Sequence, residues 1–172
     1  MKIKSILAAA ALTIVASSAF ATNTVVTLVQ DPVNAAKYTG GFNISHTSAF
    51  TDTFTFSPSF QSSTVSTVLT SIGFDKVTNI DFTSVKLNGV ALSITNGVVD
   101  VAQTLTQLNL TGPLTLVVSG KAGVANTPNF NASYSGTINV TAVPEPETFA
   151  MLGAGLALVG FAARRRKAAN QA

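Results

Sequence analysis

The chain has 172 residues, a formal net charge of +3 and only 10% charged residues, well below the roughly 25% of an average globular chain. It contains no cysteine and one histidine, His46, which excludes disulfides, a thiolate zinc site, a cysteine nucleophile and a multi-histidine metal site. The positive charge lies at the ends, in Lys2, Lys4 and the cluster 164–167. The remaining four lysines face seven acidic residues, a net charge of −3, so we expect no nucleic-acid partner.

Residues 1–21 predict an N-terminal signal peptide with a helical apolar stretch. A short basic start precedes a Leu/Ala/Ile/Val run, which ends in the small residues Ala19 and Ala21 on either side of Phe20. Small side chains fit the pockets of signal peptidase, so cleavage is expected after Ala21, leaving Thr22 as the first residue. The alternative, an uncleaved membrane anchor, is disfavoured by the small-x-small site and the polar residues that follow it.

Residues 22–143 predict one secreted all-β domain. Threonine, serine and asparagine make up 45 of its 122 residues; threonine favours extended backbone, and serine and asparagine favour turns. Apolar residues alternate with polar ones at a period of two, and no helical stripe is present. About nine short strands with close turns predict an antiparallel β-sandwich, either jelly-roll-like or Ig-like.

Three local patterns refine this prediction. The alternation slips in phase near Thr83-Ser84, which predicts a β-bulge. Asn88-Gly89 predicts a type I′ hairpin turn because both residues tolerate positive φ, and Asn96-Gly97 predicts a second such turn. The Gly-, Asn- and Pro-bearing segment 122–131 predicts a loop.

Phe50, Asp52 and Phe54 alternate and should face the same side of one strand. An aspartate between two phenylalanines is costly to desolvate unless it has a partner. We expect its carboxylate to accept backbone N–H groups, to pair with a lysine or to cap the sheet edge. Calcium binding is the alternative, but no Asp-x-Asp-x-Asp loop supplies the usual oxygen cluster.

No catalytic, cofactor-binding or metal site is predicted. His46 is close to Asp52 in sequence and serines are abundant, but no Gly-x-Ser-x-Gly elbow is present and a triad is defined by geometry. We interpret His46 as a partly buried structural histidine. Phosphate loops, dinucleotide fingerprints and metal-ligand spacings are also missing from the sequence, so the domain is not expected to be an enzyme.

The C-terminus has three parts followed by a tail, 168–172. Pro144, Glu145 and Pro146 precede an apolar run, 149–163, and then the basic cluster 164–167 that contains Arg164, Arg165 and Arg166. As a helix the apolar run would be about 22 Å long, against a hydrocarbon core of about 30 Å. With arginines snorkelling at one end, it predicts a marginal transmembrane helix whose C-terminus is cytoplasmic. An ordinary tail anchor is the alternative.

Segment 144–167 resembles the PEP-CTERM sorting signal of Gram-negative bacteria in its motif, apolar span and basic cluster. The resemblance implies processing by an exosortase, transient anchoring in the inner membrane and release to the cell envelope or the exterior. Phe50, Asp52 and Phe54 resemble the Phe-x-Asp-x-Phe signature of a subset of these proteins, whose role is unassigned.

Together these features predict an exported structural protein of the envelope or of an exopolysaccharide (biofilm) matrix. The expected partners are signal peptidase, an exosortase, transiently the inner membrane, and exopolysaccharide. The alternative is a non-catalytic carbohydrate-binding module at the cell surface, for which Tyr38, Tyr134 and the phenylalanines are the candidates to stack on sugars.

Overall fold

The computed structural model describes residues 21–73, 75, 78–123, 131–143 and 146–169. The predicted signal peptide, including Ala19, lies outside the described residues except for Ala21. Pro144 and Glu145 and most of the predicted loop 122–131 also lie outside them.

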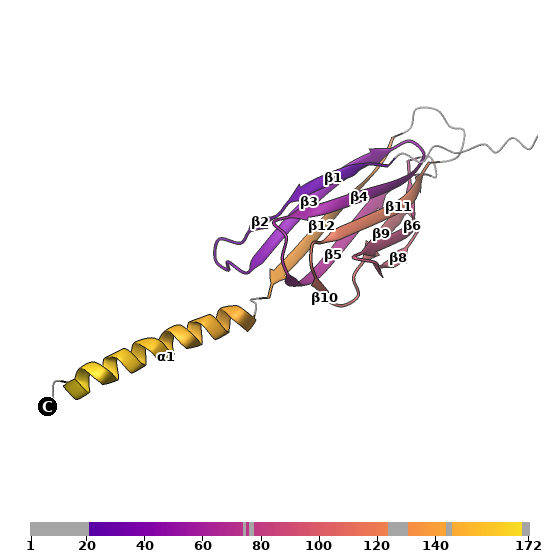
Figure 1. Ribbon diagram of the computed structural model, residues 1–172. Coiled ribbons are helices and arrows are strands. Elements are labelled where there is room, and N and C mark those ends of the chain that lie inside the picture. Colours follow the sequence, from indigo (N-terminus) through magenta and orange to yellow (C-terminus); the bar gives the residue numbers. More distant parts are fainter. Residues whose placement is uncertain (1–20, 74, 76–77, 124–130, 144–145, 170–172) are drawn as a thin grey trace, which may run out of the picture.

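The described residues form two β-sheets and one C-terminal helix (Figure 1). The first sheet has the strand order β1 (Asn23–Thr27), β4 (Ala49–Ser57), β11 (Thr115–Ala122), β6 (Ile80–Leu87) and β7 (Val90–Ala91). The second has the order β2 (Val29–Gln30), β3 (Lys37–His46), β12 (Ala132–Ala142), β5 (Ser62–Ile72), β9 (Val99–Gln103) and β8 (Ser93–Thr95), with β10 (Leu108–Thr111) paired to β5. The helix is α1 (Pro146–Ala169).

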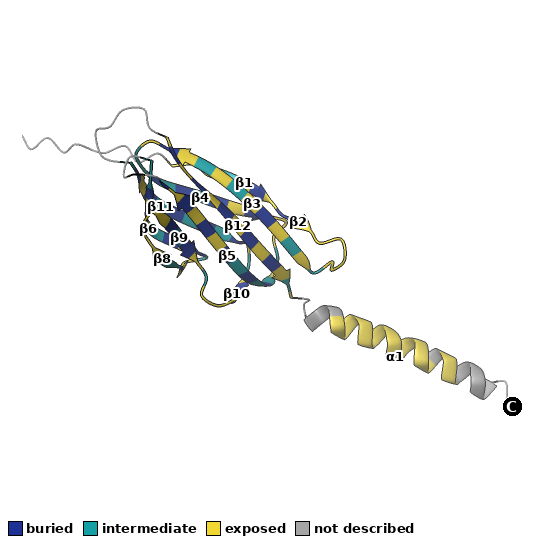
Figure 2. Cartoon of the chain, turned by 180° about the vertical axis from the view of Figure 1, so that it is seen from behind, coloured by how far each residue is buried: buried dark blue, intermediate teal, exposed yellow. Residues whose placement is uncertain are grey.

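The core lies between the two sheets. Buried and exposed residues alternate along the long strands (Figure 2), so each sheet has one inner face that packs in the core and one outer face that is exposed. Inner residues of the two sheets meet directly: the rings of Phe42 on β3 and Phe54 on β4 have centroids 4.1 Å apart. This two-layered β arrangement agrees with the predicted sandwich. The choice between jelly-roll-like and Ig-like topology stays a prediction.

Two details of the predicted fold were wrong. The first sheet is not wholly antiparallel, because β1 pairs with β4 in parallel, from Asn23↔Thr53 to Thr27↔Ser57. The described residues contain twelve strands rather than about nine. One unpredicted strand, β2, has only two residues, and the return strand after the Asn88-Gly89 turn is divided into two short strands, β7 and β8.

The predicted bulge and first hairpin are confirmed. Ser119 pairs with Ser84 but Gly120 pairs with Phe82, so Thr83 is the extra residue in β6. Asn88 and Gly89 have φ values of 46° and 83° between β6 and β7, as a type I′ turn requires.

The second predicted turn is a hairpin of a different kind. Thr95 pairs with Val101, so the connection from β8 to β9 is longer than two residues. Neither Asn96 nor Gly97 is among the described residues with positive φ. Instead, the Asp100 carboxylate closes the turn by accepting the Gly97 amide at 2.8 Å.

Two inward-facing glycines make room for phenylalanine rings from the neighbouring strand. Gly136 pairs with Phe42 across β12 and β3, and Gly120 pairs with Phe50 across β11 and β4. A Cβ at Gly136 would overlap the Phe42 ring, with Cε2 only 2.6 Å away. Strand glycines are normally unfavourable, and here they provide the space that lets these rings lie over the sheet.

We therefore expect Gly136→Ala to lower the free energy of unfolding by roughly 1–3 kcal/mol through overpacking. Gly41→Ala is the matched control, because Gly41 lies on the outer face of the same sheet and its nearest neighbour would be 3.8 Å from the new Cβ. The control should be neutral or more stable by about 0.4–1 kcal/mol. Urea unfolding measures the stability of both variants. Equal effects at the two glycines would contradict the view that Gly136 provides space for the Phe42 ring.

The predicted C-terminal helix is present as α1, but the expected transmembrane span is not supported. Among the described residues, no helix combines the length and apolarity needed to cross a membrane. The apolar run has only fifteen residues, three of them glycine, and arginines follow it directly.

Candidate functional site

Phe50, Asp52 and Phe54 share the inner face of β4, as their alternation predicts. Their exposed fractions are 2%, 0% and 0%. Asp52 is thus a carboxylate placed wholly inside the core, where an unpaired charge would be strongly unfavourable.

The partners of Asp52 come from two strands of the opposite sheet and from the start of the described chain. His46 Nε2 on β3 and Tyr134 Oη on β12 both lie 2.6 Å from Asp52 Oδ2. The Thr22 amide donates to Asp52 Oδ1 at 3.3 Å. Because a carboxylate can only accept, Nε2 of His46 carries the donated proton. The expected backbone N–H partner is therefore present, whereas the main partners are a histidine and a tyrosine rather than a lysine.

Aromatic rings enclose this cluster, which we call the Asp52 cluster (Asp52, His46, Tyr134). The His46 ring stacks on Phe50 with centroids 3.9 Å apart and planes 3° apart. Phe82 meets the Tyr134 ring edge-on at 5.5 Å. Burial, together with the hydrogen bond to Asp52, raises the pKa of Tyr134 far above its usual range, so its hydroxyl stays protonated and remains a donor.

The chemistry available to the Asp52 cluster is limited by its enclosure. His46 is 7% exposed, Tyr134 1% and Asp52 0%. Among the described residues no serine hydroxyl hydrogen-bonds to His46, and no group of three or more potential metal-ligating side chains is found. The arrangement is that of a buried polar network that links the two sheets through hydrogen bonds from β3 and β12 to β4.

A second buried carboxylate, Asp100 on β9, is less well satisfied. Its Oδ1 accepts the Gly97 amide, while its Oδ2 has no partner within the described part of the chain. Desolvation raises the pKa of Asp100, and the bond from Gly97 opposes that shift only in part. Because the folded pKa lies above the unfolded one, this group lowers stability as the pH rises from the unfolded value towards the folded one.

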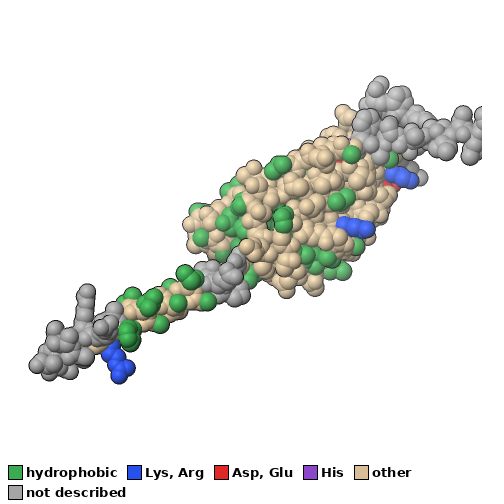
Figure 3. Space-filling model, in the orientation of Figure 1, with side chains coloured by type: hydrophobic (Ala, Val, Ile, Leu, Met, Phe, Trp, Pro, Cys, Tyr) green, Lys and Arg blue, Asp and Glu red, His purple; other side chains and the backbone are tan. Residues whose placement is uncertain are grey.

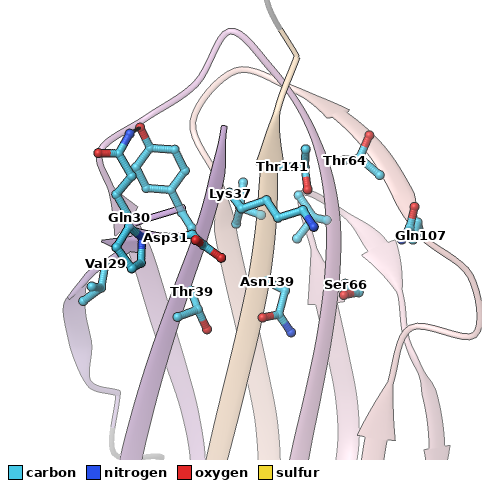
Figure 4. Close-up of a pocket in the computed structure, with 14 residues that line it drawn as sticks. Val29, Gln30, Asp31, Lys37, Thr39, Thr64, Ser66, Gln107, Asn139 and Thr141 are labelled. Atoms are coloured by element: carbon cyan, nitrogen blue, oxygen red, sulfur yellow. Dashed lines mark hydrogen bonds between the residues drawn. The ribbon is translucent and has the colours of Figure 1, made fainter. Parts of the chain in front are cut away.

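A groove of about 550 Å³ lies on the outer face of the second sheet (Figure 4). Its floor is made of outward-facing side chains of β3, β12 and β5. Gln30 and Asp31 stand on one side, and Thr64 and Gln107 on the other. Backbone hydrogen bonds from Val33 and Asn34 hold the pKa of Asp31 below its usual value, so the groove contains one carboxylate and the Lys37 ammonium.

Several polar side chains of this groove have no hydrogen-bond partner within the described residues: Lys37, Ser66, Gln107, Asn139 and Thr141. By contrast, the Thr64 hydroxyl donates to Asn109 Oδ1 at 2.9 Å. The unpartnered groups offer hydroxyl, amide and ammonium donors to a ligand. This groove could not be predicted from the sequence, because the three strands that form its floor are neighbours only through long-range pairing.

The face of the domain seen in Figure 3 carries few charged side chains, and single apolar side chains are scattered over it. Along β12 the outward residues are Ser133, Ser135, Thr137, Asn139 and Thr141. The two tyrosine candidates differ in position: Tyr134 is buried, whereas Tyr38 packs on Phe60 with ring centroids 4.8 Å apart and lines the groove.

The sorting segment presents its apolar side chains to solvent. Phe149, Leu152, Leu156 and Phe161 of α1 are each 61% exposed or more, and Arg164 is also exposed. The side chains of Pro146, Arg165 and Arg166 lie outside the described part.

A family model described as the PEP-CTERM protein-sorting motif matches residues 142–167. The chain is thus of the class of proteins that carry a PEP-CTERM sorting signal, which confirms the resemblance seen in the sequence. The signal implies exosortase processing and membrane-anchored sorting to the cell envelope or the outside. The Phe-x-Asp-x-Phe subset stays a prediction. No curated protein and no solved structure matches the chain.

Proposed function

We propose that this protein is a non-catalytic structural component of the cell envelope or of an exopolysaccharide matrix, delivered there through its sorting signal. One observation carries the proposal: the signal follows a domain whose outer sheet faces consist largely of threonine, serine and asparagine. Such surfaces hydrogen-bond readily to hydrated, hydroxyl-rich polymers and carry little charge that would attract other partners.

The enclosure of the Asp52 cluster supports a non-catalytic role. A general acid or base must come within hydrogen-bond reach of its substrate. His46 is the chain's one histidine, and its Nε2 is already bonded to a fully buried carboxylate.

The test is deletion of the gene in the producing strain, followed by isolation of the matrix. We expect a matrix that is less cohesive and lacks this protein, while the isolated polysaccharide keeps its chain length. Longer polymers in the deletion strain would instead indicate a hydrolase. The structural role would be wrong if deletion left the matrix unchanged and the matrix of the wild-type strain did not contain the protein.

The groove favours a second candidate function, a non-catalytic carbohydrate-binding module. Its free donors and acceptors lie on neighbouring strands, as recognition of successive sugar hydroxyls requires. We expect the double variant Ser66→Ala/Asn139→Ala to bind the strain's soluble polysaccharide roughly tenfold more weakly than wild type, because it loses two hydrogen bonds. Thr55→Ala, an exposed threonine of the other sheet, is the control. Calorimetric titration measures the three affinities, and equal affinity of all three proteins would exclude the groove as the polysaccharide-binding site.

A further inference from the structure

Both backbone polar groups of Thr22 are hydrogen-bonded to residues of β4. Its carbonyl accepts the Thr53 amide at 2.8 Å, and its amide nitrogen lies 3.3 Å from Asp52 Oδ1. Thr22 is also the residue that the sequence predicts to become the N-terminus after export.

The two oxygens of Asp52 are unequally satisfied. Oδ2 receives two hydrogen bonds of 2.6 Å, whereas Oδ1 receives only the longer one from the Thr22 amide. The carboxylate is fully buried, and a charge so placed is strongly stabilised by a compensating charge at hydrogen-bond distance.

We propose that removal of the signal peptide completes the Asp52 cluster by creating an α-ammonium group at Thr22 that pairs with Asp52 Oδ1. The inference depends on the predicted cleavage after Ala21. Water adds across the Ala21–Thr22 peptide bond; the carboxylate leaves with Ala21, and the freed amine of Thr22 takes up a proton. The same nitrogen that donates as a neutral amide in the precursor then donates as a cation.

Asp52 is the acidic group positioned to pair with the new ammonium group. β1, which Thr22 precedes, contains no titratable side chain. The titratable groups that contact Asp52 are His46 from β3 and Tyr134 from β12, and both bind its other oxygen. Processing therefore fastens the parallel edge strand β1 to the core, so that the mature domain is more stable than its precursor.

The sign of the pH dependence follows from the pairing. An α-amino group ordinarily titrates near about pH 8, and pairing with a carboxylate raises its folded pKa above its unfolded pKa. The added stability is therefore complete below the unfolded pKa and is lost as the pH rises through the folded pKa.

Two chains that begin at Thr22 and at Ala21, both ending at Ala172, test the proposal. Every strand of the described structure begins at Asn23 or later, so both chains retain the whole fold, and Ala21 already precedes Thr22 in the structure without displacing it. We expect the Thr22 chain to melt several degrees higher at pH 7. The difference should disappear near pH 11, which separates an effect of charge from an effect of length.

Chemical reactivity gives a second readout. Acylation of the Thr22 amine at pH 8, followed by mass spectrometry, should be roughly fivefold slower than that of the Ala21 amine, the factor that a rise of one pKa unit produces at a pH close to the unpaired value. Equal melting temperatures together with equal reactivity would overturn the pairing. N-terminal sequencing of the exported protein separately tests the cleavage site, and a start other than Thr22 would refute the processing step on which the proposal depends.

Discussion

Asp52→Leu is expected to lower the free energy of unfolding by about 3–5 kcal/mol, the cost of breaking a buried, hydrogen-bonded charge cluster from one side. The variant leaves the Tyr134 hydroxyl and the His46 N–H without an acceptor inside the core. Asp52→Asn keeps one acceptor oxygen and should cost less, roughly 1–3 kcal/mol.

Urea unfolding at neutral pH measures these differences. Asp81→Asn is the matched control, because Asp81 is an exposed aspartate on β6, and its replacement should change the stability by no more than about 0.5 kcal/mol. If Asp52→Leu proved as stable as wild type, the cluster would not be the structural element described above.

The same proteins test the calcium alternative. We expect a chelator to leave the melting temperature of the wild type unchanged. The three groups that contact the carboxylate, an amide, an imidazole and a phenol, donate hydrogen bonds to it, and none is a carboxylate or carbonyl oxygen of the kind that binds calcium. A fall of several degrees with chelator that is absent in Asp52→Asn would show that a metal ion stabilises the fold by mass action.

Replacing all four residues 164–167 with serine is expected to reduce processing of the sorting signal severely. The change removes the cluster of positive charge that follows the apolar run, and that charge should orient and retain the segment at the membrane. Fractionation and immunoblotting of the producing strain should show less processed protein in the envelope and in the medium.

A control for lost charge is available in the domain. Lys37, Lys86 and Lys121 lie on exposed positions of β3, β6 and β11, and replacing them with serine should leave processing unchanged. Equal processing of the tail variant and the wild type would show that the basic cluster is dispensable for sorting.

The sequence predicted the local features of the fold well, and for a physical reason. The alternation of Phe50, Asp52 and Phe54, the slip at Thr83 and the Asn88-Gly89 turn are all set by neighbouring residues through backbone geometry. The sorting signal is likewise contiguous, so its motif could be recognised without a structure.

Features that depend on distant residues were not predictable in this way. Tyr134 is 82 residues from Asp52, and nothing in the local pattern of either residue identifies the other as its partner. The alternation of Val90, Leu92 and Ile94 predicts one return strand after the Asn88-Gly89 turn. The chain instead passes from one sheet to the other at the buried Leu92, between β7 and β8, a change that period-two alternation does not encode. The prediction of a two-residue turn at Asn96-Gly97 was wrong, because the Asp100 carboxylate stabilises a longer connection.

The position of β12 determines how the domain bears mechanical load. The sorting segment continues from this strand, which is paired along nearly its whole length with β3 on one side and β5 on the other. Tension applied through the C-terminus acts along the strand axis, so both ladders are sheared at once and their hydrogen bonds share the force. An edge strand such as β2, pulled in the same direction, would load a single ladder. A domain tethered through its C-terminus thus transmits traction into the most extensively paired strand of its second sheet.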